Sequence, residues 1–186
     1  MFYLMRHGQD DENYIGGWSD VNLIESGRDE VYKTALWIKK NLRINRIVCS
    51  SIKRAVESAK IVSEVLGIPY MICEDFKEQN KGLLNGLDKN IAKVKFADYV
   101  GDDVGIDTVY PDGESLRDLY NRVKNNFSKF LSIDDNVLVI THRGVINMFY
   151  YILNNIPLDM DKKRFGVVTA SVHMVDKKNM LIKKVR

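Results

Sequence analysis

The sequence predicts one α/β domain: a three-layer α/β/α sandwich with a mostly parallel central sheet. Short apolar runs, typical of buried strands, alternate with longer stretches whose apolar residues recur at helical spacing. The 186 residues contain no repeat, low-complexity stretch or linker, so we expect a single domain over 1–186.

Composition narrows the class of protein further. Apolar residues make up 45% and charged residues 28% of the chain, which is typical of a soluble globular domain. The net charge of +3 comes without a basic tract, so no nucleic-acid partner is expected. The apolar runs are too short to span a bilayer and no signal peptide is visible, so we expect a cytoplasmic protein without a membrane partner. Cys49 and Cys73 are expected to be reduced thiols.

The first part of the chain predicts three strands and two helices. The strands are expected at 2–5, 44–50 ("INRIVCS") and 69–73 ("PYMIC"). The helices are expected in "ESGRDEVYKTALWIKKNL" and in "SIKRAVESAKIVSEVLGIP". Ser26 with Asp29 resembles a capping box for the first helix, and Gly67 is expected to end the second.

The rest of the chain continues the alternation after a less regular part. Residues 88–111 contain a short amphipathic piece and a loop, and we expect them to form a cap over the site. Helices are expected in "ESLRDLYNRVKNNFSKFL" and "RGVINMFYYIL", with the apolar strand "NVLVI" between them. "GVVTASVHMVD" and "NMLIKKV" are expected as closing strands, with His173 facing solvent.

Cationic and imidazole side chains follow three of the predicted strands. Arg6-His7-Gly8 follows the first strand, Arg54 comes shortly after the second, and His142-Arg143-Gly144 follows "NVLVI". Ligands of open parallel sheets bind beyond the carboxyl ends of the strands, where these residues would meet. Arg54 and Arg143 begin helices, where a cation opposes the helix dipole unless an anion lies beside it. The simplest such anion is a phosphoryl group.

Several phosphoryl chemistries are excluded by missing motifs. The P-loop pattern G-x-x-x-x-G-K-S/T is absent. Cys49 and Arg54 are five positions apart, whereas cysteine phosphatases need six, and no Asp-x-Asp follows a strand. Histidine therefore remains as the nucleophile.

The chain resembles the histidine phosphatase superfamily, which includes cofactor-dependent phosphoglycerate mutases. The resemblance rests on blocks in family order: "LMRHG", "GWSDVNLIESGRDE", "CSSIKRAVESA", "KEQNKGLLNGLDK", "YPDGESL" and "THRGVI". It covers most of the chain and is weakest over 88–109. It implies a phosphoglycerate mutase-like fold.

The resemblance also implies roles for individual residues. His7 would be the nucleophile that becomes phosphohistidine, and Glu78 would donate the proton to the leaving oxygen. Glu74 and Asp75 are the alternatives for this acid. The residues implied to bind the phosphoryl oxygens are Arg6, Arg54 and His142, and the further substrate-binding residues expected are Asn13, Gly16, Gly17, Arg143 and Gly144. Since arginines supply the positive charge, neither a metal nor another cofactor is expected.

Five positions depart from the family pattern. Gln9 and Asp10 replace the usual glutamate and the serine or threonine after it, and Gly16 stands where mutases have threonine. Leu84 lies where some family phosphatases have a second acid. Arg143 replaces a small residue, and we hypothesise that it contacts a second negative group on the substrate.

These features favour a metal-independent phosphatase of a small phosphorylated metabolite over a mutase. The segment between Glu78 and "YPDGES" is short, and no tail follows the last strand to shield a phosphohistidine from water. A mutase and a degenerate member that only binds phosphorylated ligands are the alternatives. Charged residues of the cap would repel or attract the substrate; these are Asp102, Asp103, Asp107, Lys89, Lys93 and Lys95. The oligomeric state stays open.

Overall fold

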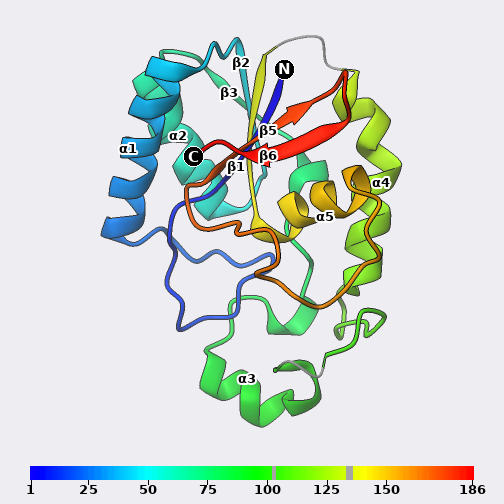
Figure 1. The fold of residues 1–186 in the computed structure, drawn as a ribbon. Coiled ribbons are helices and arrows are strands. Elements are labelled where there is room, and N and C mark those ends of the chain that lie inside the picture. Colours follow the sequence, from blue (N-terminus) through cyan, green and yellow to red (C-terminus); the bar gives the residue numbers. More distant parts are fainter. Residues whose placement is uncertain (102–103, 133–135) are drawn as a thin grey trace.

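A mixed six-stranded sheet forms the centre of the molecule (Figure 1). The computed structural model describes residues 1–101, 104–132 and 136–186. The strands are β1 (Phe2–Arg6), β2 (Arg46–Cys49), β3 (Tyr70–Ile72), β4 (Val137–Thr141), β5 (Val172–Asp176) and β6 (Leu181–Lys184), in the order β3-β2-β4-β1-β5-β6. The first four strands are parallel, whereas β5 is antiparallel to both β1 and β6. The predicted mostly parallel sheet is therefore confirmed.

Helices cover both faces of this sheet and complete the predicted three layers (Figure 1). One face carries α1 (Glu25–Asn41) and α2 (Lys53–Leu66), and the other carries α4 (Leu116–Leu131) and α5 (Arg143–Leu153). Each face has its own buried apolar cluster. Shorter elements are α3 (Lys89–Lys95) and the 3₁₀ turns η1 (Glu74–Phe76), η2 (Gly82–Leu84) and η3 (Ala97–Tyr99).

The capping box predicted for α1 is wrong. Ile24 is the N-cap residue and provides no side-chain cap, so Ser26 lies inside the helix. The helix begins earlier because the backbone N–H of Ile24 donates to the carbonyl oxygen of Gln9 at 3.0 Å. A complete capping box occurs instead at the start of α4, between Ser115 and Asp118.

The first closing strand is shorter than predicted, and His173 is buried rather than solvent-facing. The strand begins only at Val172, because the segment before it turns at Gly166 and Ala170, whose φ angles are +59° and +53°. His173 has an exposed fraction of 0% because β5 lies inside the sheet, between β1 and β6. Its two ring nitrogens contact Tyr150 Oη at 2.8 Å and Ser171 Oγ at 2.9 Å.

The described residues of 88–111 pack around a small third cluster, away from the sheet (Figure 1). Ile15, Leu84, Ala92, Val104 and Tyr110 are its buried residues. The acidic residues Asp102 and Asp103 lie outside the described residues. Among the helices of the described residues, none is both long and apolar enough to cross a bilayer.

Candidate active site

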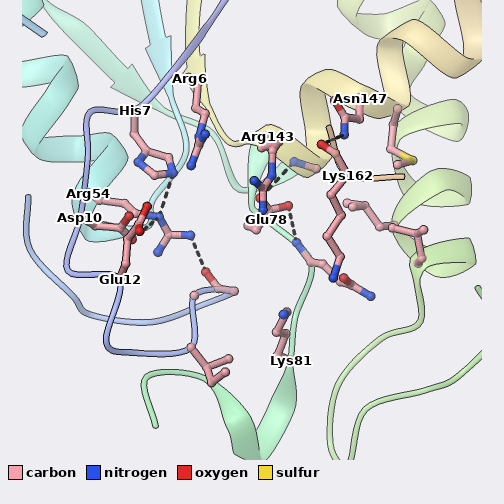
Figure 2. A pocket seen from close by; sticks show the side chains of 18 of the residues that line it. Arg6, His7, Asp10, Glu12, Arg54, Glu78, Lys81, Arg143, Asn147 and Lys162 are labelled. Atoms are coloured by element: carbon pink, nitrogen blue, oxygen red, sulfur yellow. Dashed lines mark hydrogen bonds and ion pairs between the residues drawn. The ribbon is translucent and has the colours of Figure 1, made fainter. Parts of the chain in front are cut away.

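A cavity of about 450 Å³ lies beyond the carboxyl ends of the parallel strands (Figure 2). Arg6 ends β1, and the loop after this strand brings His7 and the segment 10–17 to the cavity. Arg54 reaches it from the first turn of α2, and Arg143 from the first residue of α5. The strand ends thus bring together the side chains that the sequence places after them.

His7 is a buried imidazole with an assignable tautomer. Its Nδ1 lies 2.7 Å from the carbonyl oxygen of Gly8, so Nδ1 carries the hydrogen. Its Nε2 accepts from Arg54 Nε at 3.1 Å and therefore has its lone pair directed at the guanidinium. Burial, Arg54 and Arg6 hold the pKa of His7 well below its usual value. The ring is thus neutral at physiological pH, with Nε2 available as a nucleophile.

The guanidinium of Arg54 is held rigidly although its helix position is unfavourable. Besides His7, it donates to Ser19 Oγ at 3.1 Å and to the carbonyl oxygen of Gly17 at 2.8 Å. A single hydroxyl connects the loop after β1 to the first turn of α2: Ser58 Oγ accepts from the N–H of Gly8 and donates to the carbonyl oxygen of Arg54. The positions of the imidazole and of this guanidinium are therefore coupled.

Arg6 presents a second guanidinium to the cavity. Its Nη1 donates to the carbonyl oxygen of Val167 at 3.1 Å, whereas its buried Nε has no partner among the described residues. Burial and the nearby Arg143 lower the pKa of Arg6 to about 10, so the group stays cationic near neutrality. Its position suits a bound anion.

His142 lies beside His7 but behind the cavity wall. The two ring centroids are 5.1 Å apart, with an angle of 55° between the planes. His142 is fully buried, and its Nε2 lies 2.9 Å from Ser50 Oγ, while Nδ1 lacks a partner among the described residues. Burial and Arg54 hold its pKa well below the usual value. This neutral ring thus lies beside that of His7 but does not line the cavity, so the predicted contact of His142 with the phosphoryl oxygens stays a prediction.

Glu78 lies on the opposite side of the cavity from Arg54, against the start of α5 (Figure 2). Its carboxylate accepts from the backbone N–H groups of Gln79 at 3.0 Å and Gly144 at 3.1 Å. A Cβ atom at position 144 would lie 2.1 Å from Glu78 Oε1, so any larger residue there requires the carboxylate to move. The alternatives Glu74 and Asp75 do not line the cavity; they pair with Lys77 and Lys129 instead.

The backbone around Glu78 is held by groups to which sequence reasoning assigned no role. The guanidinium of Arg122 donates to the carbonyl oxygens of Lys77 and Glu78 and pairs with Glu114 at 2.7 Å. Trp18 Nε1 also donates to the carbonyl oxygen of Glu78, at 2.7 Å. Trp18 and Glu114 belong to the quoted blocks "GWSDVNLIESGRDE" and "YPDGESL", which were the signals for this network in the sequence.

The other expected substrate-binding residues divide into two groups. Gly16, Gly17, Arg143 and Gly144 line the cavity. Asn13 does not: it is exposed, and its amide donates to Asp11 Oδ1 at 2.9 Å. Within the described part of 88–111, Lys89 alone lines the cavity, and Asp107 pairs with Arg117 at 2.5 Å.

The cavity is also lined by charged and polar residues that sequence reasoning did not place there. The segment 10–12 contributes three acids, and Asp10 lies 3.5 Å from Arg54 Nε. Lys81, Asn147 and Lys162 line the part beyond Glu78. Asn147 lies one helical turn after Arg143, a spacing that would have indicated a shared face.

Fold and site together define an α/β enzyme with a neutral histidine, two guanidiniums and a carboxylate around one cavity. Within the described residues, no group of three His, Cys, Asp or Glu side chains is placed to hold a metal ion. The chain belongs to the histidine phosphatase superfamily, branch 1, whose model matches residues 2–182. The resemblance seen in the sequence is thereby confirmed, as is a phosphatase-family enzyme.

Individual relatives include both phosphatases and mutases. The chain is 28% identical over 149 residues to the uncharacterized phosphatase PhoE of Bacillus subtilis, covering 77% of this chain and 72% of that protein. It is 33% identical over 135 residues to a 2,3-bisphosphoglycerate-dependent phosphoglycerate mutase of a Methylobacterium strain, covering 66% and 64%. The solved structure of a putative α-ribazole-5′-P phosphatase from Escherichia coli shares the fold, with a TM-score of 0.82, 18% identity and coverage of 98% and 93%.

Proposed function

We propose that the protein is a metal-independent phosphomonoester phosphatase that acts on a small phosphorylated metabolite through a phosphohistidine intermediate. The observation that carries this proposal is the tautomer of His7, whose Nδ1 donates to Gly8 and whose Nε2 lone pair faces Arg54. A neutral imidazole beside fixed cations has the protonation state that attack on phosphorus requires.

In the first step, His7 Nε2 forms a bond to phosphorus while the bond from phosphorus to the alcohol oxygen breaks. A phosphoryl oxygen takes over the Nε donor of Arg54 that now points at Nε2, and Arg6 Nε supplies an unused donor. Glu78, protonated for this step, transfers its proton to the leaving oxygen. The ring becomes positively charged, and the hydrogen bond from Nδ1 to Gly8 stabilises that charge.

In the second step, water attacks phosphorus and the bond from phosphorus to Nε2 breaks. The Glu78 carboxylate accepts a proton from this water, and inorganic phosphate leaves. His7 returns to its neutral form with the hydrogen on Nδ1, and Glu78 is again protonated. No redox partner or metal takes part in this cycle.

Hydrolysis is favoured over mutase chemistry by the limited cover of the cavity. Although residues 88–111 are proposed as a cap, Lys89 is the only described residue among them that lines the cavity. This limited cover supports access of water to the phosphohistidine. We also propose a cytoplasmic location, which is supported by the two free thiols Cys49 and Cys73.

The test uses p-nitrophenyl phosphate in the presence of EDTA. We expect turnover by the wild-type protein, none by His7→Ala, and a loss of about 10²-fold or more in Arg54→Ala. Lys53→Ala is the matched control, since Lys53 is the exposed neighbour of Arg54 and does not line the cavity. Folding of each variant is checked by circular dichroism.

Three results would contradict the proposal. Binding of phosphate esters without turnover would indicate a protein that only binds phosphorylated ligands. Interconversion of phosphoglycerates that depends on a bisphosphate would indicate a mutase. Turnover that EDTA abolishes would remove the metal-independent mechanism.

A further inference from the structure

Three cationic side chains line the part of the cavity beyond Glu78, where the proposed chemistry does not use them. Lys81 comes from the loop before η2, Arg143 begins α5, and Lys162 belongs to the segment that follows α5. Figure 2 shows the charged ends of both lysines directed toward the space in front of Glu78, with Arg143 between this space and Arg6. Separate parts of the chain thus deliver positive charge to one place.

The charged ends of Lys81, Arg143 and Lys162 make no hydrogen bond or ion pair to any described residue. Lys81 Nζ contacts the ring of Tyr110, at 5.4 Å from the ring centroid, and this contact brings no negative charge. Burial and the neighbouring cations Lys162 and Arg143 lower the pKa of Lys81 to about 8, although Glu78 opposes this effect. Crowded like charges destabilise the protein unless an anion binds among them.

The acidic residues nearby have other partners. Asp159 accepts from Tyr151 Oη at 2.6 Å and pairs with Arg164, and Asp161 accepts from the backbone N–H of Lys163. Glu78 accepts from two backbone N–H groups. Asp10 pairs with Arg54 at the other end of the cavity. None of these carboxylates forms an ion pair with the three cations.

One residue positions Lys162 in particular. Asn147 Nδ2 donates to the carbonyl oxygen of Lys162 at 3.3 Å and so ties this segment to α5. Asn147 lies four residues after Arg143, on the same face of the helix. The hydrogen bond from Asn147 therefore holds the backbone of Lys162 at a fixed place relative to Arg143.

We propose that Lys81, Arg143 and Lys162 form a second-anion subsite, and that preferred substrates carry a carboxylate or second phosphate in addition to the phosphomonoester. This inference rests on the proposed function, because the phosphomonoester must lie at His7 for its other end to reach the subsite. Arg143 lines the same cavity as His7 and Arg6, and Figure 2 shows it between Glu78 and Arg6, next to the phosphoryl end. The two anionic groups would therefore be separated by only a few bonds.

Matched pairs of substrates test the subsite. 3-Phosphoglycerate and glycerol 3-phosphate share a carbon chain and differ in the carboxylate, whereas fructose 1,6-bisphosphate and fructose 6-phosphate differ in the second phosphate. We expect wild-type kcat/KM to favour the more acidic member of at least one pair. The pair that shows the larger preference identifies carboxylate or phosphate as the second group.

Charge-removing variants then assign the preference to the subsite. In Arg143→Gln, Lys81→Gln and Lys162→Gln, the ratio of kcat/KM within the preferred pair should fall about tenfold. Arg143→Lys should retain part of it. Lys40→Gln removes an exposed charge from α1 and should leave the ratio unchanged. A wild-type ratio near one in both pairs, or a ratio unaffected in all three variants, would overturn the inference.

A binding measurement separates this inference from the proposed function. Calorimetric titration of each pair into His7→Ala reports affinity without phosphohistidine formation. A preference for the acidic member that disappears with Arg143→Gln in this background supports the subsite even if the wild-type protein hydrolyses nothing. Equal affinities within both pairs would overturn the subsite even if p-nitrophenyl phosphate is turned over.

Discussion

At position 144 a side chain larger than a hydrogen atom would displace the Glu78 carboxylate. The Gly144→Ala variant would place Cβ within 2.1 Å of Glu78 Oε1, and the carboxylate must move to relieve this contact. Because we propose Glu78 as the proton donor, kcat for p-nitrophenyl phosphate should fall about 10²-fold or more. Steady-state kinetics on the purified variant measures this loss.

The control for this substitution is Arg117→Ala. Arg117 occupies the second position of α4, as Gly144 does in α5, but it pairs with Asp107 and does not line the cavity. It should retain wild-type kcat. Full activity of Gly144→Ala would show that Glu78 is not the acid or that its position is not critical.

Asp10 brings a negative charge to the place where phosphate is proposed to bind. Its carboxylate lies 3.5 Å from Arg54 Nε, and burial raises the pKa of Asp10. Asp10→Asn should therefore strengthen competitive inhibition by inorganic phosphate, with an inhibition constant about tenfold lower, since removing a repulsion of about 1.4 kcal/mol changes affinity tenfold. Weaker inhibition would instead assign Asp10 a positioning role on Arg54.

Site residues that directly follow strands could be predicted from the sequence. The residues of other elements that hold them in place could not. His7, Arg54 and Arg143 could be placed because parallel strands end at one edge of a sheet. Arg122 and Ser58 could not, because each is an ordinary helix residue until the packing of its helix brings it to a distant loop. Asn13 followed the family pattern, but its amide bonds Asp11 instead of lining the cavity.

His173 of strand β5 belongs to a buried polar chain whose hydrogens can be assigned. Ser171 Oγ donates to the carbonyl oxygen of Val168 at 2.6 Å, so it accepts from His173 Nε2, and Tyr150 Oη donates to His173 Nδ1. This arrangement requires a neutral ring, and burial lowers the pKa of His173 to about 4. The chain supports the segment 167–171, whose carbonyl oxygens bind Arg6.

The Tyr150→Phe variant tests this chain. It leaves His173 Nδ1 buried without a donor, so the free energy of unfolding should fall by about 1–3 kcal/mol. Urea denaturation at pH 7.5 measures the change. Because Tyr120 is a partly buried tyrosine of α4 with no hydrogen bond from its hydroxyl in the described structure, Tyr120→Phe is the matched control and should be nearly neutral. An equal effect of both substitutions would contradict the assignment.

Element boundaries were predictable where local chemistry determines them and were wrong where a distant contact or an unusual backbone conformation does. Gly67 ends α2 with a φ of +72°, as its sequence position predicts. The start of α1 depends on a hydrogen bond to Gln9, and β5 starts late because the chain before it turns at Ala170, a non-glycine residue with a φ of +53°. Neither feature leaves a pattern in the neighbouring sequence.

For the molecule as a whole, three buried neutral histidines make stability depend on pH. The pKa values of His7, His142 and His173 are all below the value of about 6.5 expected in the unfolded chain. Below that pH the unfolded state binds more protons than the native state, so stability falls as pH falls. From pH 7.5 to 5.5 the loss should be about 4 kcal/mol, or about 1.4 kcal/mol for each histidine.

Urea denaturation across this range measures the loss, and NMR of the imidazole nitrogens tests its cause. His7 should keep its hydrogen on Nδ1, and none of the three rings should titrate near pH 6.5. A flat stability curve, or a ring that protonates near its ordinary pKa, would contradict the assignment. The matched control is the unfolded protein in urea, in which all three rings should titrate normally.

The hydroxyl of Ser58 joins the loop of His7 to the first turn of α2, whereas Glu78 is held from α4 and α5 on the other face of the sheet. If the two helical layers shift relative to each other, His7 and Arg54 therefore move together, and only Glu78 changes its distance from them. A small relative displacement of the layers would leave phosphorylation geometry intact while altering how easily the alcohol departs. Substitutions that loosen α4 should consequently slow poor leaving groups more than good ones.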